Sequence, residues 1–303
     1  MGYNIKDENV TEQIINEESV HQTDLDDMQK HNDFAYPSFK IGMTSIRTLK
    51  KDIPDNTKTP IAVDVGSGGA PMGKILEDNG FNTYRCELDP NSLYQGLMWN
   101  NESPETGKHI VCDGSYLPFS NNSVDVVFCK EFIHHIYDYS SFFNEINRIL
   151  KCGGILLMIE PTKTLISKDD DHFEHYFQTI NKYFASLKNN NLKPYRYYFY
   201  YYTLSKKFKF FNILQRYYNK ENISSKETNN INILLKKLMQ RFIGGSNVIF
   251  SRKTGDVKIY KERPEIKIVE PNKLVLDENY FKDSRLNEIK EILNKVYEEL
   301  NSN

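Results

Sequence analysis

The sequence predicts an α/β protein built on a mostly parallel sheet with helices on both faces. Two observations carry this prediction. Between about residues 60 and 160, short β-rich runs alternate with helical patterns, and glycine and proline residues separate them. The chain has 303 residues, enough for one large domain with additions. Because crossover helices pack back on the sheet that they connect, such alternation indicates a parallel sheet covered on both faces.

Five runs have the composition of buried strands and are expected at residues 61–65, 83–86, 109–112, 124–129 and 155–159. A later run at 247–253 is expected to add another strand. The longest apolar run, Ile155–Ile159, is far shorter than the roughly 20 residues that cross a bilayer. The sequence therefore predicts no membrane span.

Helical patterns lie between these strands. Pro71 suits the first position of a helix, and Gly80 is a stop signal about nine residues later. A second helix is expected around residues 92–99. A third is indicated over 140–150 by apolar residues at i, i+3, i+4 and i+7, with the glycine pair at 153–154 ending it before the next strand.

A glycine-rich bend, Asp64-Val65-Gly66-Ser67-Gly68, follows the first predicted strand and precedes the first helix. Glycines there let the backbone approach a ligand, and the helix N-terminus offers unpaired N–H groups to it. A nicotinamide dinucleotide is disfavoured, because Pro71 occupies the third glycine position of the G-x-G-x-x-G pattern. Taken alone, the bend could also be an ordinary strand-to-helix turn.

Two carboxylates follow at the ends of the next two strands. Glu87 ends the second strand, 19 positions after Gly68, where it can accept hydrogen bonds from both hydroxyls of a ribose. Asp113, followed by Gly114, closes the third strand, and an acid there can accept from an adenine amino group. Parallel strands end at one edge of a sheet, so these residues outline an adenosine site. Asp89 competes with Glu87 for the ribose, and Asp113 could instead cap a turn.

Two longer segments, Asp113–Val127 and Arg148–Pro161, carry a resemblance to a known family. They read D-G-S-Y-L-P-F-S-N-N-S-V-D-V-V and R-I-L-K-C-G-G-I-L-L-M-I-E-P. The chain resembles the S-adenosylmethionine-dependent methyltransferases of the Rossmann-like class I, particularly the methyltransferase type 11 group. The resemblance covers roughly residues 60–160 and the late strand. It implies a seven-stranded sheet whose last strand is antiparallel, with S-adenosyl-L-methionine as the cofactor.

The resemblance also implies a role for each residue of the outlined site. Glu87 would hold the ribose, and Asp113 with Gly114 would face the adenine. The methionine end of the cofactor would be bracketed by Asp64, Gly66, Ser67 and Gly68. The sequence departs from the family at Ala70, where many members have glycine.

The sequence indicates methyl transfer, with oxygen as the expected acceptor atom. A hydroxyl acceptor would gain from a general base, and the candidates are His135 and His134, which follow the fourth strand at the same edge of the sheet. Either histidine could instead order the loop. His172 and His175 suggest a metal site with Glu174, but no third ligand has suitable spacing, so no metal is expected.

The predicted domains are an acidic N-terminal cap over residues 1–39, a methyltransferase domain over 40–254 with a substrate lid inserted at about 162–245, and a C-terminal extension over 255–303. Residues 1–33 contain nine acids and two bases. Residues 182–220 contain nine bases and no acid, together with a dense aromatic run. The extension ends in the apolar stripe of an amphipathic helix at about 286–300.

These features favour a small or glycan-linked acceptor, including an anionic one. The basic aromatic stretch could also bind RNA through phosphate contacts and stacking, or its tyrosines could simply pack on the sheet. A formal net charge of −2 argues against a dedicated nucleic-acid binder. A catalytically silent S-adenosylmethionine-binding protein is a further alternative, and pairing of two chains through the last helix stays open.

We expect a cytoplasmic location, because no secretory signal is found and no Cys-x-x-Cys pairing occurs.

Overall fold

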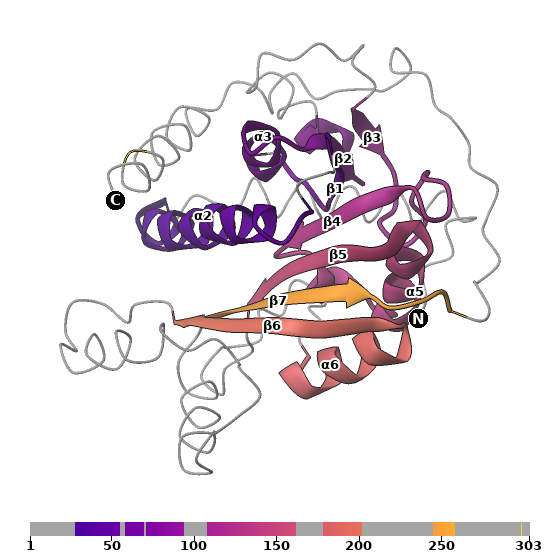
Figure 1. Ribbon diagram of the computed structural model, residues 1–303. Coiled ribbons are helices and arrows are strands. Elements are labelled where there is room, and N and C mark those ends of the chain that lie inside the picture. Colours follow the sequence, from indigo (N-terminus) through magenta and orange to yellow (C-terminus); the bar gives the residue numbers. More distant parts are fainter. Residues whose placement is uncertain are drawn as a thin grey trace, which may run out of the picture.

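The computed structural model describes residues 28–54, 58–69, 71–93, 108–161, 178–201, 245–257 and 298 (Figure 1). Its centre is a seven-stranded sheet with the strand order β3-β2-β1-β4-β5-β7-β6. The strands are β1 (Ile61–Val65), β2 (Asn82–Glu87), β3 (His109–Val111), β4 (Val124–Lys130), β5 (Leu150–Pro161), β6 (Leu192–Tyr201) and β7 (Gly245–Lys253). Only β7 runs antiparallel to its neighbours. The expected sheet, mostly parallel with an antiparallel last strand, is therefore confirmed.

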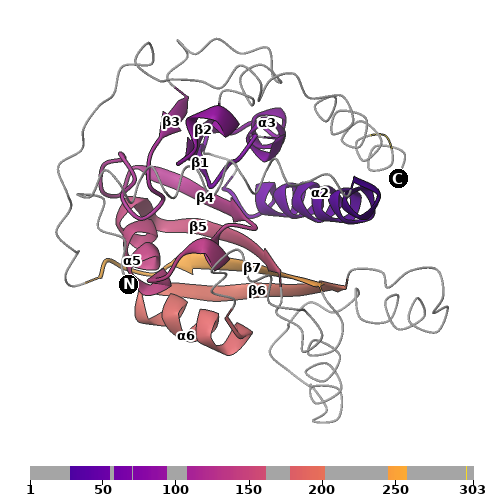
Figure 2. The same cartoon turned by 180° about the vertical axis from the view of Figure 1, so that it is seen from behind.

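Helices cover both faces of this sheet (Figures 1 and 2). On one face lie α2 (Met28–Lys50) and α3 (Pro71–Asp78), which pack on the buried side chains of one apolar core. On the other face lie α5 (Tyr139–Ile149) and α6 (Ile180–Asn189), which form a second core with the opposite side of the strands. Of the helices described, none is long and apolar enough to span a membrane.

Helix α2 is the largest element that the sequence did not predict. Pro37 lies inside it, and an internal proline normally argues against a continuous helix. Further along, Ile41, Ile46 and Leu49 are buried against the sheet. The expected boundary between an N-terminal cap and the main domain, at residues 39 and 40, falls within this single helix.

The third helix was predicted nearly correctly, but the start of the fifth strand was not. Helix α5 begins after Asp138, whose carboxylate accepts a hydrogen bond from the Ser141 backbone N–H at 3.0 Å. The helix ends at Ile149, and β5 begins directly at Leu150 and continues through the glycine pair at 153–154. These glycines do not end a helix. They lie where β5 meets β4 with a shift in register between Val124 and Val126.

The aromatic run at 195–201 contributes to the sheet rather than to a lid. Strand β6 takes up residues up to Tyr201, and α6 precedes it, so residues 180–201 of the predicted lid belong to the main domain. Tyr195 packs edge-on against Phe250 of β7, and its hydroxyl donates to the Asp52 carboxylate at 2.8 Å. Packing accounts for this part of the basic aromatic stretch. The remaining lid residues, 162–177 and 202–244, lie outside the described residues.

Other expected elements also fall outside the described part of the chain. The helix expected at 92–99 begins at Pro90 and is described only as far as Leu93. Residues 1–27, which hold most of the acidic segment, are not described. The amphipathic stripe at 286–300 is likewise outside, apart from Glu298.

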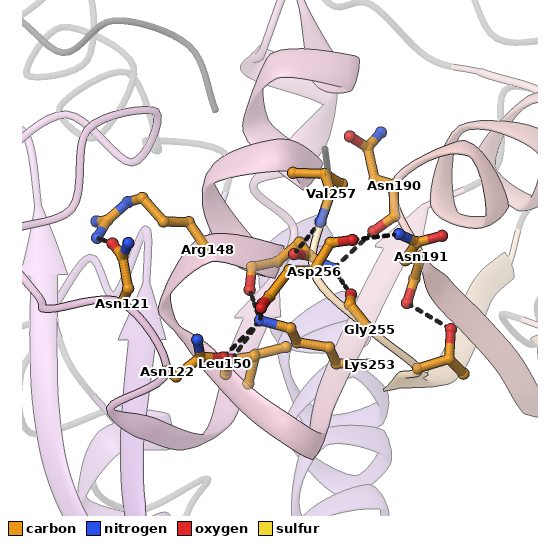
Figure 3. Close-up of polar contacts among 12 residues, drawn as sticks. Asn121, Asn122, Arg148, Leu150, Asn190, Asn191, Lys253, Gly255, Asp256 and Val257 are labelled. Atoms are coloured by element: carbon orange, nitrogen blue, oxygen red, sulfur yellow. Dashed lines mark hydrogen bonds and ion pairs between the residues drawn. The ribbon is translucent and has the colours of Figure 1, made fainter. Parts of the chain in front are cut away.

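A buried lysine ties the end of β7 to the end of α5 (Figure 3). The Nζ of Lys253 donates to the backbone oxygens of Asn147 at 2.7 Å and Leu150 at 2.9 Å, and to the side-chain oxygen of Asn122 at 2.7 Å. It also forms an ion pair with Asp256 at 2.6 Å, while its own side chain has no exposed surface. The ammonium therefore satisfies carbonyl groups at the C-terminus of α5 that would otherwise lack donors.

We expect Lys253→Met to lower the free energy of unfolding by roughly 2–4 kcal/mol, because the buried oxygens lose charged donors. Urea denaturation followed by circular dichroism measures this change. Lys151→Met is the matched control: Lys151 pairs with Asp125 at 2.8 Å, but its side chain is 43% exposed. Its loss should cost less than about 1 kcal/mol. Equal losses in the two variants would contradict the role assigned to Lys253.

Candidate functional site at the carboxyl edge of the sheet

The glycine-rich bend after β1 turns over the end of β2. Gly66 and Gly68 both have positive φ angles, 68° and 50°, which favour glycine. The backbone N–H groups of Gly66 and Ser67 donate to the carbonyl of Cys86 at 2.9 and 3.1 Å. The N–H of Gly68 donates to the Glu87 carboxylate at 2.7 Å. The bend and Glu87, which are 19 positions apart in the sequence, are thus in direct contact.

The turn after β3, which contains Asp113 and Gly114, lies beside the glycine-rich bend and Glu87. The N–H of Cys112, just after β3, donates to the carbonyl of Glu87 at 2.9 Å. Asp113 follows, and one of its oxygens accepts the Ser115 N–H at 2.7 Å. That contact is the turn-capping role considered for Asp113 from the sequence. A Cβ on Gly114 would lie 2.9 Å from the Val65 side chain at the end of β1, so this turn also meets the bend.

Glu87 and Asp89 have different hydrogen-bond partners. Asp89 is buried, and its two carboxylate oxygens accept the N–H groups of Asn91 and Ser92 at 3.0 Å each. It also accepts from the Ser92 hydroxyl at 2.7 Å. Asp89 therefore caps the helical turn that begins at Pro90. This arrangement leaves Glu87 as the carboxylate facing the bend.

Three carboxyl groups at this edge have raised pKa values. Burial raises the pKa of Asp64 to about 7, although the charge of Arg85 opposes the rise. Burial also raises the pKa of Glu87, although hydrogen bonds from Gly68 and Leu88 lower it in part. Burial raises the pKa of Asp113 in the same way, and hydrogen bonds from Ser115 oppose that rise. The cause in each case is loss of water around the charged form. A positively charged ligand would favour that ionised form.

Two buried oxygen atoms of the bend have no partner within the described residues. They are Oδ2 of Asp64 and the hydroxyl of Ser67, which belong to residues 2% and 8% exposed. A buried polar atom without a hydrogen bond costs free energy, and such atoms are uncommon in folded proteins. Their position beside the glycine bend suits a polar ligand that supplies the missing contacts.

A second cluster lies at the ends of β4 and β5. The fully buried Glu160 accepts the N–H groups of Phe132 and Ile133 at 3.0 and 2.8 Å through one oxygen. Its other oxygen lies 2.9 Å from Nδ1 of His134. The rings of His134 and His135 have centroids 4.2 Å apart. The structure therefore places both candidate histidines in a loop that Glu160 holds.

Sequence reasoning missed Glu160. A signal was present, because Glu160 is the penultimate residue of β5, much as Glu87 is the last residue of β2. Helix α2 was missed as well, yet it also contacts this loop: the Ser38 hydroxyl donates to the Glu131 carboxylate at 2.7 Å. Although burial opposes the shift, Lys130 and Ser38 hold the pKa of Glu131 below its ordinary value.

The described residues contain no group of three or more His, Cys, Asp or Glu side chains arranged to hold a metal ion. His172 and His175 lie outside these residues, so their metal-binding alternative is untouched by the structure. The four cysteines are free. Cys86 and Cys129 are buried, and burial raises the pKa of both thiols.

Residues 63–158 match a family model described as a methyltransferase domain. Phosphoethanolamine N-methyltransferase 2 of Caenorhabditis elegans is 27% identical over 136 residues, which are 45% of this chain and 30% of that protein. A demethylmenaquinone methyltransferase of Corynebacterium glutamicum is 24% identical over 177 residues, 57% of this chain and 73% of that one. The chain thus spans less than a third of the nematode relative.

Solved structures agree with the fold. A geranyl diphosphate methyltransferase in complex with S-adenosylmethionine superposes with a TM-score of 0.50 and 15% identity, covering 70% of this chain and 85% of that one. The strand order, the glycine bend and the matched segment together define a Rossmann-like class I methyltransferase fold. Residues 63–158 therefore form a methyltransferase domain, and the chain is similar over this part to the named methyltransferases.

We expect Glu87→Ala and Asp113→Ala each to weaken binding of S-adenosylmethionine by on the order of 1–3 kcal/mol, the value of hydrogen bonds to charged groups. Isothermal titration calorimetry measures the dissociation constant, and thermal melting verifies that each variant is folded. Asp78→Ala is the control, because Asp78 lies on α3 in an exposed ion pair with Lys74. Unchanged affinity in both site variants would remove this cofactor assignment.

Proposed function

We propose that this protein transfers the methyl group of S-adenosylmethionine to a small-molecule acceptor at the carboxyl edge of its sheet. The observation that carries the proposal is the meeting of the Gly66–Gly68 bend, Glu87 and Asp113 at the ends of three neighbouring strands. When bound, the cofactor supplies an electrophilic methyl group on a sulfonium centre. The protein has then to bind, orient and desolvate both reactants.

The residues of the bend fit the charged end of this cofactor. Asp64 and Ser67 each have a buried oxygen with no partner in the described part of the chain, and S-adenosylmethionine carries an ammonium group that can donate to such atoms. Gly66 and Gly68 let the backbone approach closely. Positive charge nearby would favour the ionised form of Asp64, whose pKa burial raises to about 7.

Glu87 and Asp113 fit the nucleoside end. Glu87 at the end of β2 would accept the ribose hydroxyls, and its present contact with the Gly68 N–H keeps the carboxylate at the bend. Asp113 accepts hydrogen bonds from the backbone and the side chain of Ser115, which hold its carboxylate at the turn where the resemblance implies the adenine amino group. Gly114 keeps this turn close to β1.

A small acceptor is supported by relatives whose names specify phosphoethanolamine, demethylmenaquinone, and sarcosine or dimethylglycine as substrates. We keep oxygen as the proposed acceptor atom, and nitrogen is the alternative that two of these relatives, both N-methyltransferases, support. A small or glycan-linked hydroxyl compound is the acceptor class that we propose. Arg196 contributes no free charge to an anionic acceptor, because it pairs with Asp52.

The loop after β4 supports proton removal from such an acceptor. With its Nδ1 held 2.9 Å from Glu160, a neutral His134 donates that proton to the carboxylate and keeps its lone pair on Nε2. A base oriented by a carboxylate is the arrangement found in nucleophile-activating triads. The order of the sequence candidates is therefore reversed in this proposal: His134 is the base, Glu160 positions it, and His135 is its neighbour.

Incubation with S-adenosylmethionine carrying a labelled methyl group, first with small-molecule extracts and then with bulk RNA, tests the proposal. We expect label in a small molecule. Label appearing in RNA would instead support the RNA methyltransferase alternative. Cofactor binding without turnover on any extract would support a silent binding protein. Either of these results would overturn the proposal.

We expect His134→Gln to lower kcat about 10²–10⁴-fold, the usual contribution of a general base, while leaving the dissociation constant of S-adenosylmethionine unchanged. His135→Gln is the matched control and should change kcat much less. A pH profile of kcat separates catalysis from folding, because loss of a base removes the limb of the profile that it produces. A His134 variant with lower stability but an unaltered profile would show a structural role only.

A further inference from the structure

Phe132 is the residue that links the two halves of the proposed cofactor site. It follows β4 and Glu131, whose φ angle of 54° is unusual for a residue other than glycine. The chain therefore turns sharply before Phe132. Its ring packs on the apolar core but remains partly exposed.

One end of this ring lies against the bend after β1. A Cβ placed on Gly66 would lie 2.1 Å from Cδ2 and 2.5 Å from Cγ of Phe132, and its three nearest atoms would all belong to this side chain. These distances are far below any allowed contact. Two constraints therefore favour glycine at position 66: the positive φ angle, and the aromatic ring, which leaves no room for a side chain.

The other end of the ring lies against the turn after β3. A Cβ on Gly114 would lie 2.7 Å from Cζ and 3.1 Å from Cε1 of Phe132. The near atoms of the ring thus contact Gly66, and the far atoms contact Gly114. Because an aromatic ring is rigid, its length sets how far apart the two glycine turns lie.

The position of the ring is itself well determined. The backbone N–H of Phe132 donates to Glu160 at 3.0 Å, and Glu160 also binds the N–H of Ile133 and Nδ1 of His134. On the core side, the ring packs against Phe142 with centroids 5.6 Å apart. The same carboxylate therefore places both the ring and the proposed base.

We propose that Phe132 is a positioning residue that sets the spacing between the methionine-side bend at Gly66 and the adenine-side turn at Gly114. This inference rests on the proposed cofactor site. A side chain of different shape at position 132 would let the two turns move independently, and the contacts of Glu87 and Asp113 with one ligand would no longer be satisfied together.

Phe132→Leu tests this role with Phe142→Leu as the matched control. Both substitutions remove the same atoms from the same core, and the two rings touch, but Phe142 is not among the nearest atoms of either glycine. We measure the dissociation constant of S-adenosylhomocysteine by calorimetry and the melting temperature of each variant. We expect Phe132→Leu to raise this constant about tenfold or more, the effect of misplaced contacts. Phe142→Leu should change it less than about threefold, although it should lower the melting temperature more, because Phe142 is fully buried whereas Phe132 is partly exposed.

A double variant provides an independent readout. Gly114→Ala alone should weaken binding, because its methyl group meets Cζ of Phe132. Leucine has no atom at that position, so Gly114→Ala combined with Phe132→Leu should weaken binding less than the product of the two single effects. If the double variant weakened binding by the full product of the two single effects, the inference would be overturned. Equal effects of Phe132→Leu and Phe142→Leu would also overturn it, because they would show loss of packing alone.

Glu87→Ala in the same series distinguishes failure of the inference from failure of the proposed site. If Glu87→Ala weakens binding and Phe132→Leu does not, the cofactor site stands and the spacing role of Phe132 is rejected. If neither changes the dissociation constant, the cofactor site and the inference both fall.

Discussion

The carboxylate of Glu160 organises the loop on which the whole carboxyl edge depends. It is completely buried and bound to three donors from consecutive residues, Phe132, Ile133 and His134. Burying a carboxylate costs free energy unless its oxygens accept hydrogen bonds. Few other conformations of this loop would supply donors to the buried Glu160 carboxylate. Through Phe132 the constraint reaches the turns at Gly66 and Gly114, and through His134 it reaches the proposed acceptor side. One polar residue at the end of β5 thereby couples four strand ends.

Two buried charged side chains, Lys253 and Asp64, differ in how their polar atoms are satisfied. At the amino edge of β5, the ammonium of Lys253 has four partners from the protein itself, and the network closes the end of the domain. At the carboxyl edge, Asp64 keeps an oxygen without a partner in the described residues, and burial raises its pKa to about 7. Satisfied groups stabilise a fold, whereas unsatisfied ones in a site are a cost that a ligand can remove.

The parts of the molecule that could be predicted from sequence are those with short-range causes. The β1 strand, the bend with positive φ angles at Gly66 and Gly68, and the carboxylates at the ends of β2 and β3 each have a local signal. Helix α2 has no such clear signal, because Pro37 interrupts its pattern and its stability comes from packing on the sheet. The sequence predicts a lid where strand β6 lies, because a run of tyrosines is equally compatible with a packed edge strand and with a binding surface.

By itself, the sequence determined the class of fold, the family resemblance and the identity of the residues along the proposed cofactor edge. These follow from periodicity, from glycine at turns and from polar residues at strand ends, all of which act within a few positions. Only the tertiary structure decided that Asp89 caps a helical turn while Glu87 faces the bend, and that His134 is held by Glu160. It also decided that one aromatic ring separates Gly66 from Gly114. The physical reason is that these contacts, apart from the local cap at Asp89, join residues from 18 to 66 positions apart, and only the closed sheet brings them within hydrogen-bonding or van der Waals distance.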